Sequence, residues 1–494
     1  MLLLLVLHAD GCPQNPRPVA TRESVIPFSP LCMLHDPPRN PLSAATLANA
    51  DSDSCFLRTL RRLDTLAIHG GAAPCPATGA RTTPLYQTTS FVFEGASHAQ
   101  DLFSLDEPGN IYSRIGNPTV EVFEKRMAAM EGGVGALATS SGLAAITTSL
   151  LTILGAGDHI VADQHLYGGT FHLFRETLPK LGISTTFVDM SNESAIEEAI
   201  QHNTKCVYGE IVRNPKLNVL DIELVSSVAH HFGLPLIIDA TFATPYLCRP
   251  IEHGADIVVH SATKWLGGHG VAVGGVIVDS GSFDFQDPVK FPGFNEDDLS
   301  YSVGRSSPKP MVYSRDWGPA AFIVKARAQF LRDVGCSMSP MHAFQIMQGC
   351  ETLHLRMERH CSNALAVAEF LRDHPAVSWV TYPSLPDHPS QELLQQYFRD
   401  GMGGAVVVFG IKGGLEAGQT FIEHCSLFSH LANVGDAKSL VIHPASTTHR
   451  QLSEADLKST GTATDLVRLS VGLEHPDDLL ADLDFALRVA TSGR

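Results

Sequence analysis

The 494-residue chain has little positive charge: 35 lysines and arginines stand against 52 acidic residues, and the formal net charge is −17. Nucleic acids and anionic membrane surfaces bind proteins through basic faces, so this balance argues against both as partners. The sequence also contains no stretch that is long and uncharged enough to span a bilayer. The apolar start at residues 2–7 is short and has no basic segment before it, so we expect no secretion signal.

The sequence also lacks the spacings that build disulfide frameworks and metal sites. Its ten cysteines are scattered, and no Cys-x-x-Cys pair occurs among them. Such usage is typical of a reduced, cytoplasmic protein. His165, His260 and His269 show no paired ligand spacing, so no metal is expected.

The length exceeds what one hydrophobic core usually holds, so two domains are the default expectation. Prolines break every periodic pattern in residues 1–60, which we interpret as a disordered extension. A targeting segment and an error in the gene model are alternative explanations. Beyond it we expect a segment over residues 61–132, a large domain over 133–318 and a small domain over 319–494.

Short apolar strands alternate with helices in the predicted large domain. The strands are predicted at 135–139, 158–162, 204–210, 236–239, 257–260 and 273–278, and the helices at 140–154, 168–181 and 223–232. This alternation predicts an α/β domain with a mostly parallel sheet covered on both faces. Ligands of such sheets bind at the carboxyl ends of the strands.

The predicted small domain mixes strands and helices differently. A helical stretch at 319–334 leads into it, and further helices are predicted at 353–371, 417–428 and 477–489, with strands at 378–382, 404–409 and 467–471. This order is typical of an α+β domain.

A lysine and an acid follow two neighbouring strands of the predicted sheet. Asp239 ends the apolar run Pro-Leu-Ile-Ile-Asp, and Lys264 follows the next strand in Val-Val-His-Ser-Ala-Thr-Lys. An aldehyde cofactor with a pyridine ring needs such a pair, because the lysine forms the Schiff base and the acid keeps the ring nitrogen protonated. The pair predicts pyridoxal 5'-phosphate (PLP) as cofactor.

A phosphate site is predicted next to this pair. The run Ser-Ser-Gly-Leu-Ala at 140–144 follows a strand and opens a helix, whose free N–H groups and positive end attract a phosphate. Taken alone, such a run is more often an ordinary small-residue cap. Ser261 and Thr263, just before Lys264, add hydroxyl donors for the same phosphate, and the combination is the stronger signal.

Two other residues follow strands at the same predicted edge. Tyr167, in Leu-Tyr-Gly-Gly-Thr, is suited to stack on a pyridine ring and offer its phenol to a substrate; a core aromatic is the alternative. Asn214 comes after the strand that ends at Glu210 and would bond the ring oxygen of the cofactor; a plain turn is the alternative.

Two arginines are candidate anion ligands. Arg114, in Tyr112-Ser-Arg114, lies in a Gly/Asn/Pro-rich segment, and arginine is the preferred bidentate ligand of phosphate. A surface arginine is the alternative there. Arg468 lies inside the apolar run Leu-Val-Arg-Leu-Ser, where a guanidinium is costly to bury without an anion. Either a substrate carboxylate or a structural ion pair would supply that anion.

Taken together, these motifs resemble the Cys/Met-metabolism family of PLP-dependent enzymes, and within it most of all the O-acetylhomoserine sulfhydrylases. The similarity runs from about Leu63 to the C-terminus. It includes Tyr-Ser-Arg-Ile-Gly-Asn-Pro-Thr from Tyr112, Leu-Tyr-Gly-Gly-Thr from Leu166, the run from Asp239 to Lys264, Asn-Val-Gly-Asp-Ala-Lys-Ser from Asn433 and Arg-Leu-Ser-Val-Gly from Arg468.

The resemblance implies a role for each of these residues. Lys264, Asp239 and Tyr167 would be catalytic: Lys264 as Schiff-base lysine and proton shuttle, Asp239 as partner of the pyridinium nitrogen, and Tyr167 as the stacking residue that assists the leaving group. The phosphate would be held by Gly142, Leu143 (through its backbone), Ser261 and Thr263, together with Tyr112 and Arg114 of the neighbouring subunit. The substrate would be bound by Arg468, Asn214 and Asn433.

The resemblance also implies a fold, an assembly and an activity. The large domain would have the aspartate-aminotransferase-like fold (fold type I), and the arm at 61–132 would reach the neighbouring site in a homodimer or homotetramer. The activity would be γ-replacement on O-acetyl-L-homoserine with sulfide or methanethiol, giving homocysteine or methionine plus acetate. The alternatives are a carbon or nitrogen nucleophile in secondary metabolism, γ-elimination, and a catalytically inactive binding homologue.

Four features depart from the pattern of the family. Ala240 stands where an asparagine is usual, Leu143 where sulfhydrylases commonly carry glutamine, and Arg213 where small residues are preferred. The segment at 302–310 resembles an insertion near the entrance of the active site. Because of these departures, the sequence does not identify the nucleophile. They make a specialised γ-substitution enzyme of secondary metabolism an alternative to the sulfhydrylase.

Overall fold

The computed structural model describes residues 62–213, 216–301, 310–444 and 464–492. Three predictions from the sequence fall outside these ranges: the disordered extension at 1–60, the contact of Asn214 with the cofactor, and the insertion up to residue 309. None of the helices in the described parts of the chain combines the length and apolar character that crossing a membrane requires.

A seven-stranded sheet forms the centre of the predicted large domain, in the order β1-β7-β6-β5-β4-β2-β3. The five strands from β6 to β3 run parallel, while β7 is antiparallel to both of its neighbours. The strands are β1 (Gly135–Thr139), β2 (His159–Asp163), β3 (Ser184–Val188), β4 (Thr204–Glu210), β5 (Leu236–Asp239), β6 (Ile257–His260) and β7 (Gly275–Asp279). The mostly parallel α/β sheet expected from the sequence is confirmed.

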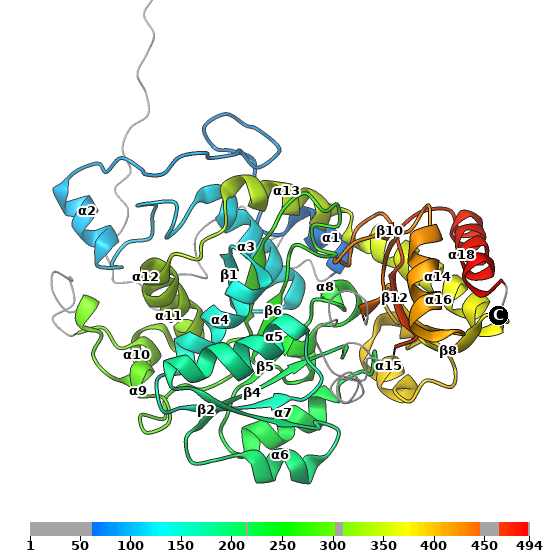
Figure 1. Ribbon diagram of the computed structural model, residues 1–494. Coiled ribbons are helices and arrows are strands. Elements are labelled where there is room, and N and C mark those ends of the chain that lie inside the picture. Colours follow the sequence, from blue (N-terminus) through cyan, green and yellow to red (C-terminus); the bar gives the residue numbers. More distant parts are fainter. Residues whose placement is uncertain (1–61, 214–215, 302–309, 445–463, 493–494) are drawn as a thin grey trace, which may run out of the picture. The chain divides into compact units, whose positions relative to one another are not determined.

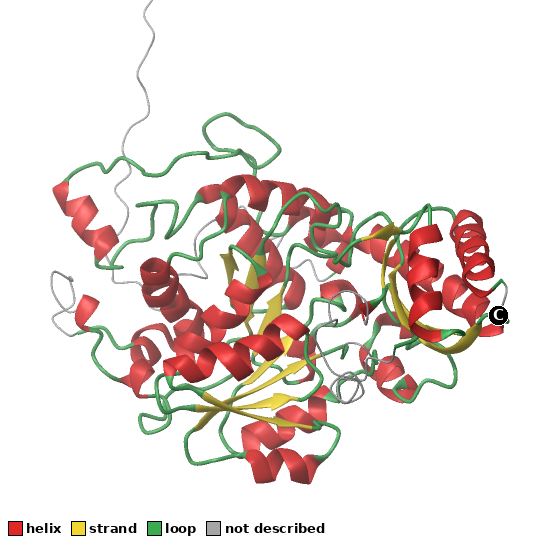
Figure 2. Cartoon of the chain, in the orientation of Figure 1, coloured by secondary structure: helices red, strands yellow, loops and turns green. Residues whose placement is uncertain are grey.

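Helices cover both faces of this sheet (Figure 2). They include α3 (Pro118–Glu131), α4 (Gly142–Ile153), α5 (Gly168–His172), α6 (Glu193–Ala199) and α7 (Ile222–His231). Successive residues of β4 are buried in different clusters: Val207 belongs to one hydrophobic core, and Cys206 and Tyr208 to the other. Alternation along a strand sends side chains to opposite faces, so both faces of the sheet are sealed from water.

A second sheet of five strands lies in the predicted small domain, in the order β10-β11-β12-β9-β8. Its strands are β8 (Val377–Thr381), β9 (Val406–Ile411), β10 (Ser429–His430), β11 (Leu440–Ile442) and β12 (Leu466–Ser470). The helices α14 (Leu353–Asp373), α16 (Gly414–His424) and α18 (Pro476–Thr491) share one hydrophobic cluster with this sheet. In Figure 1 these elements lie together in the yellow-to-red part of the chain.

The sequence analysis described one helix of the large domain as continuous when it is broken, and it missed one strand of that domain and one helix of the segment before it. The predicted helix at 168–181 is broken: α5 passes into a π-helix over Leu173–Thr177 and a 3-10 turn over Leu178–Leu181. Pro179 lacks the N–H that a continuous helix needs, which accounts for the last break. The edge strand β3 was missed because it is only half-buried and has little apolar pattern. Helix α3 was missed although Asn117 caps it and Pro118 begins it.

Backbone and side-chain contacts join the segment after β6 to residues of the second half of the chain. Arg356 of α14 donates to the carbonyls of Trp265 and Gly349, at 2.7 and 2.6 Å. The N–H of Ala437 donates to the carbonyl of Gly268 at 2.9 Å. These contacts hold the loop that contains Lys264 against the segment between β10 and β11, and so position the candidate site.

Candidate active site

Asp239 and Lys264 lie at the carboxyl ends of adjacent parallel strands. Asp239 is the last residue of β5, where it pairs in register with Val259 of β6, and Lys264 follows β6 after one short turn. The N–H of Gly268 donates to the carbonyl of Lys264 at 2.7 Å and closes the loop around the lysine. The structure therefore brings the predicted lysine and acid to one edge of the sheet, as parallel pairing requires.

The Asp239 carboxylate is anchored by the residue two positions further along the chain. Its Oδ1 accepts from the N–H of Thr241 at 2.9 Å and from the Thr241 hydroxyl at 2.5 Å. Burial raises the pKa of Asp239, and the two hydrogen bonds from Thr241 and the charge of His260 oppose that shift. The Thr241 hydroxyl also accepts from the N–H of Ser261 at 2.8 Å, which ties the acid to the loop before Lys264.

The Lys264 amine is largely buried and lies next to Asn433 and Arg468, which come from the second half of the chain. Burial, followed by the positive charge of Arg468, lowers the pKa of Lys264 to about 8. Its Nζ donates to Oδ1 of Asn433. A neutral amine is the nucleophilic form, so this environment suits a lysine that attacks an aldehyde.

Arg468 lies in the middle of β12, between Ile442 of β11 and Val408 of β9. Burial lowers the pKa of Arg468, and the nearby Tyr167 phenol opposes that shift. No ion pair to Arg468 occurs among the residues that the structure describes. The electrostatic effects of Arg468 on Lys264 and of Tyr167 on Arg468 show that these three side chains, predicted separately, come together.

The N-terminus of α4 packs against the loop before Lys264. Ser141 caps the helix by accepting from the N–H of Ala144 at 3.1 Å, which leaves the preceding N–H groups for another acceptor. A Cβ added at Gly142 would lie 2.7 Å from the Cβ of Ser261. Thr263 exchanges hydrogen bonds with the backbone of Gly274, both at 3.1 Å. Gly142 and Ser261 therefore form a close-packed cradle, and the Thr263 hydroxyl already has a backbone partner.

Replacement of Gly142 by alanine tests this cradle. Overpacking of this kind costs about 1–3 kcal/mol, so we expect the affinity for pyridoxal phosphate to fall about 10-fold or more. Titration of the purified apo-protein, followed by the visible absorbance of the bound cofactor, measures the effect. Gly95→Ala is the matched control, because an added Cβ at Gly95 meets no atom within 4 Å. Equal affinities of the two variants for pyridoxal phosphate would show that the Gly142 cradle does not bind the cofactor.

Tyr167 stands at the start of α5 and is 54% exposed, so it is not a core aromatic. Its backbone N–H donates to Oε1 of Glu210, at the end of β4, over 2.6 Å. This contact fixes where the tyrosine ring enters the site.

Tyr112 and Arg114 lie together and make other contacts than the residues above. The Arg114 guanidinium is 5.5 Å from the centre of the Tyr112 ring and donates to the carbonyl of Arg332 of its own chain. Tyr112 is 41% exposed. Within the described ranges, no hydrogen bond joins either residue to Lys264 or Asp239.

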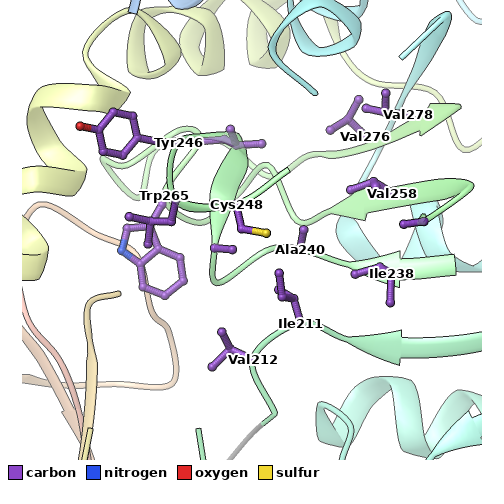
Figure 3. Close-up of a cluster of buried hydrophobic side chains, with 14 of the residues drawn as sticks. Ile211, Val212, Ile238, Ala240, Tyr246, Cys248, Val258, Trp265, Val276 and Val278 are labelled. Carbon is purple, nitrogen blue, oxygen red and sulfur yellow. The ribbon is translucent and has the colours of Figure 1, made fainter. Parts of the chain in front are cut away.

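Two of the departures from the family pattern are buried against other side chains of the protein. Ala240 is fully buried in the hydrophobic cluster of Figure 3, together with Ile211 and Cys248. Arg213 is 5% exposed, and its Nε lies 2.7 Å from Oδ2 of the buried Asp163. Among the three substituted positions, all of which the structure describes, Leu143 is the exposed one: it lies beside Gly142 with 39% of its surface exposed.

Sequence reasoning missed two residues that shape the site. Gly435 has a φ of +80°, and a Cβ there would lie 2.7 Å from the N of Trp265 and 2.9 Å from the carbonyl carbon of Lys264. This close approach is what brings Asn433 to the lysine. Thr241 was missed although a hydroxyl two residues after a buried acid is a recognisable local anchor. Among the described residues no group of histidine, cysteine and acidic side chains could hold a metal.

The amine of Lys264, the anchored carboxylate of Asp239 and the cradle at Gly142 fit a pyridine aldehyde that carries a phosphate. Together with the mostly parallel seven-stranded sheet, they define the class of PLP-dependent enzymes with fold type I.

Comparisons with known proteins agree with this class. Residues 64–488 match the model of the Cys/Met metabolism PLP-dependent enzyme family. The chain is 52% identical to an O-acetyl-L-homoserine sulfhydrylase of Leptospira meyeri, over 86% of this chain and 96% of the relative. It is 50% identical to a homocysteine synthase of Schizosaccharomyces pombe, over 86% of this chain and 98% of the relative.

A solved structure gives the same result. It is described as an O-acetylhomoserine (thiol)-lyase of Campylobacter jejuni and holds a pyridoxyl-lysine monophosphate. Its TM-score to this chain is 0.82 at 36% identity, and the match covers 87% of this chain and all of the other. The chain therefore belongs to the Cys/Met metabolism family of PLP-dependent enzymes, as its motifs predicted, and its fold and cofactor class are those of that family.

Proposed function

We propose that this protein is an O-acetylhomoserine sulfhydrylase that performs γ-replacement on O-acetyl-L-homoserine. Sulfide would give homocysteine, methanethiol would give methionine, and acetate would leave in both cases. The observation that carries the proposal is an identity of about half to sulfhydrylases and homocysteine synthases over nearly their whole length. The burial of Lys264 and Arg468 beside each other supports it, because an amino-acid substrate needs both an amine-exchange site and a carboxylate ligand.

Each predicted site residue has a proposed task. Lys264 holds the cofactor covalently and then moves protons at the substrate carbons, for which its lowered pKa suits it. Asp239 keeps the ring nitrogen protonated. The bound cofactor supplies an electron sink for the pair left when Cα loses its proton. Tyr167 stacks on the ring and assists the departure of acetate, and Asn433 and Asn214 orient the substrate.

The phosphate of the cofactor would be held from two chains. Gly142, Leu143 (by its backbone), Ser261 and Thr263 are its ligands within one chain. Tyr112 and Arg114 support a contribution to the neighbouring subunit, because they lie together, partly exposed and without a hydrogen bond to Lys264 among the described residues. The active unit is then at least a homodimer, with a homotetramer as the larger assembly, and its place is the cytoplasm.

Arg468 would bind the α-carboxylate of the substrate as a bidentate partner. Replacement by lysine keeps the charge but loses the fork geometry, and replacement by alanine loses both. A hydrogen bond to a charged group contributes about 1.5–3 kcal/mol, so we expect the KM for O-acetylhomoserine to rise about 10- to 100-fold in Arg468→Ala, and less in Arg468→Lys. Steady-state kinetics measure this. An unchanged KM in Arg468→Ala would remove the residue from the substrate site.

Product analysis tests the proposed function against its alternatives. The holoenzyme is incubated with O-acetylhomoserine and either sulfide, methanethiol, or a carbon or nitrogen nucleophile, and the products are separated by mass spectrometry. We expect homocysteine from sulfide. An adduct formed only with a carbon or nitrogen nucleophile would favour secondary metabolism, a keto acid with ammonia would show γ-elimination, and no product at all would indicate an inactive homologue.

A further inference from the structure

Glu210 is a buried carboxyl group beside Asp239 for which the proposed reaction has no task. It is the last residue of β4, it is 6% exposed, and it pairs in register with Asp239 on the parallel neighbour β5. Residues in register on neighbouring strands point to the same face of a sheet, at a strand spacing of about 5 Å. Two carboxyl groups therefore stand side by side at the edge where the cofactor ring would lie.

No cation neutralises Glu210 among the residues that the structure describes. Its hydrogen bond comes from the backbone N–H of Tyr167. Arg213, three residues further along the chain, is instead paired with Asp163 at 2.7 Å. The ionisable groups that act on Glu210 are Asp239 on β5 and Asp163 on β2, and both are acidic. The phenol of Tyr208, on β4 itself, is buried beside them.

The two carboxyl groups differ in what stabilises their charge. Asp239 accepts two hydrogen bonds from Thr241 and is favoured by the charge of His260 on β6, whereas Glu210 accepts one backbone hydrogen bond. Burial raises the pKa of Glu210 well above its ordinary value, and the neighbouring Asp239 raises it further. Two adjacent buried acids do not both ionise, so the proton of the pair resides on Glu210.

We propose that Glu210 is a positioning residue that works as a neutral carboxylic acid: it fixes the backbone of Tyr167 and leaves the negative charge of the pair on Asp239. This inference rests on the proposed PLP function of the site. In this role Oε1, the unprotonated oxygen of the Glu210 carboxyl group, accepts from the Tyr167 N–H and fixes the position of the tyrosine ring. Its neutrality keeps a second negative charge away from the ring nitrogen and from Lys264.

Three variants of the holoenzyme separate the parts of this proposal. Glu210→Gln keeps a neutral acceptor, so we expect kcat and KM within about 3-fold of the wild type. Glu210→Ala removes the acceptor, and a misplaced ring is expected to lower kcat/KM about 30- to 100-fold. In a Tyr167→Ala background, where no ring is left to position, Glu210→Ala should add less than about 3-fold.

The charge state is read from the pH dependence of the visible cofactor absorbance. We expect the pH midpoint of the absorbance change in Glu210→Gln to lie within about half a pH unit of the wild-type midpoint, since the substitution removes no charge. A shift of about one unit or more, or a loss of turnover in Glu210→Gln as large as in Glu210→Ala, would show an ionised Glu210 and overturn the proposal. Wild-type activity in Glu210→Ala would overturn the positioning role. If Glu210→Ala does not fold, the Glu210→Gln titration still decides.

Glu124→Gln is the matched control. Glu124 is also buried and also accepts a backbone N–H, that of Ala138 at 2.8 Å, but it is paired with Arg327 at 2.6 Å. Its replacement should lower the melting temperature and leave the absorbance midpoint unmoved. The titration needs only bound cofactor. A protein that binds the cofactor but makes no homocysteine would therefore contradict the proposed function and still report on Glu210.

Discussion

Lys264→Ala is expected to lose both the visible absorbance of a lysine-bound cofactor and at least about 10³-fold in turnover. Proton transfer by a positioned side chain contributes about 10²- to 10⁴-fold by itself, and this variant also loses the covalent attachment. The lowered pKa of Lys264, to about 8, identifies it as an amine whose neutral form is accessible near neutral pH. The absorbance spectrum and steady-state turnover of protein purified with pyridoxal phosphate measure both effects.

A second buried lysine provides the control for this result. Lys325 on α11 (Ala321–Lys325) is also buried, and burial lowers its pKa to about 8 as well, but it donates to the carbonyl of Thr152 and to Gln329. Lys325→Met should keep the visible absorbance and the turnover. If Lys264→Ala retained normal turnover, or if Lys325→Met lost the absorbance instead, Lys264 would not be the attachment residue.

Asp239→Ala is expected to reduce kcat by about 10²- to 10³-fold while the protein still binds the cofactor. The loss of a preorganised charge opposite a developing one has this magnitude in enzymes, and Asp239 is the anchored acid at the proposed position of the ring nitrogen. The effect should fall on kcat more than on the KM for the substrate, because the charge matters most when Cα has lost its proton. Steady-state kinetics with saturating cofactor separate the two parameters.

Asp256→Asn is the matched control for the acid. Asp256 is buried next to the same two strands, β5 and β6, but its carboxylate is bonded to His230 and to the N–H of Leu236, at the amino ends of these strands. This variant should lose stability rather than catalytic rate. A change of less than about 3-fold in kcat for Asp239→Ala would show that the ring nitrogen has another partner.

The site residues that lie in or directly after apolar strands were predictable from the sequence. Asp239 ends one run of apolar residues and Lys264 follows the next one, and parallel pairing of the two strands then brings both residues to the carboxyl ends of the strands. Arg468 was predictable for a similar reason, since a guanidinium in the middle of an apolar strand requires an anion. The strands β1, β4, β5 and β6 were predicted with the bounds that the structure shows.

Contacts between distant segments were not predictable in the same way. The approach of Gly435 to Lys264 depends on a left-handed glycine and on packing between segments about 170 residues apart, for which one sequence carries no signal. The role of Glu210 depends on strand order, because β4 and β5 must be neighbours before its carboxyl group meets Asp239. The sequence alone showed Glu210 only as the end of a strand.

The structure also shows which departures from the family pattern bear on the choice of nucleophile. Ala240 is buried in a hydrophobic core cluster, and Arg213 is paired with Asp163. Neither side chain offers a new surface to a nucleophile, so neither argues for a reaction other than sulfhydrylation. Leu143, exposed beside the cradle at Gly142, is the departure that would affect which nucleophile enters.

Borohydride trapping tests the central claim most directly. The wild-type protein is loaded with pyridoxal phosphate, reduced so that a lysine-bound cofactor becomes permanently attached, and digested for peptide mass spectrometry. We predict that the pyridoxyl group is found on the peptide that contains Lys264 and that O-acetylhomoserine, added before reduction, displaces it. A pyridoxyl group on any other lysine, or a label on Lys264 that the substrate does not displace, would contradict the account.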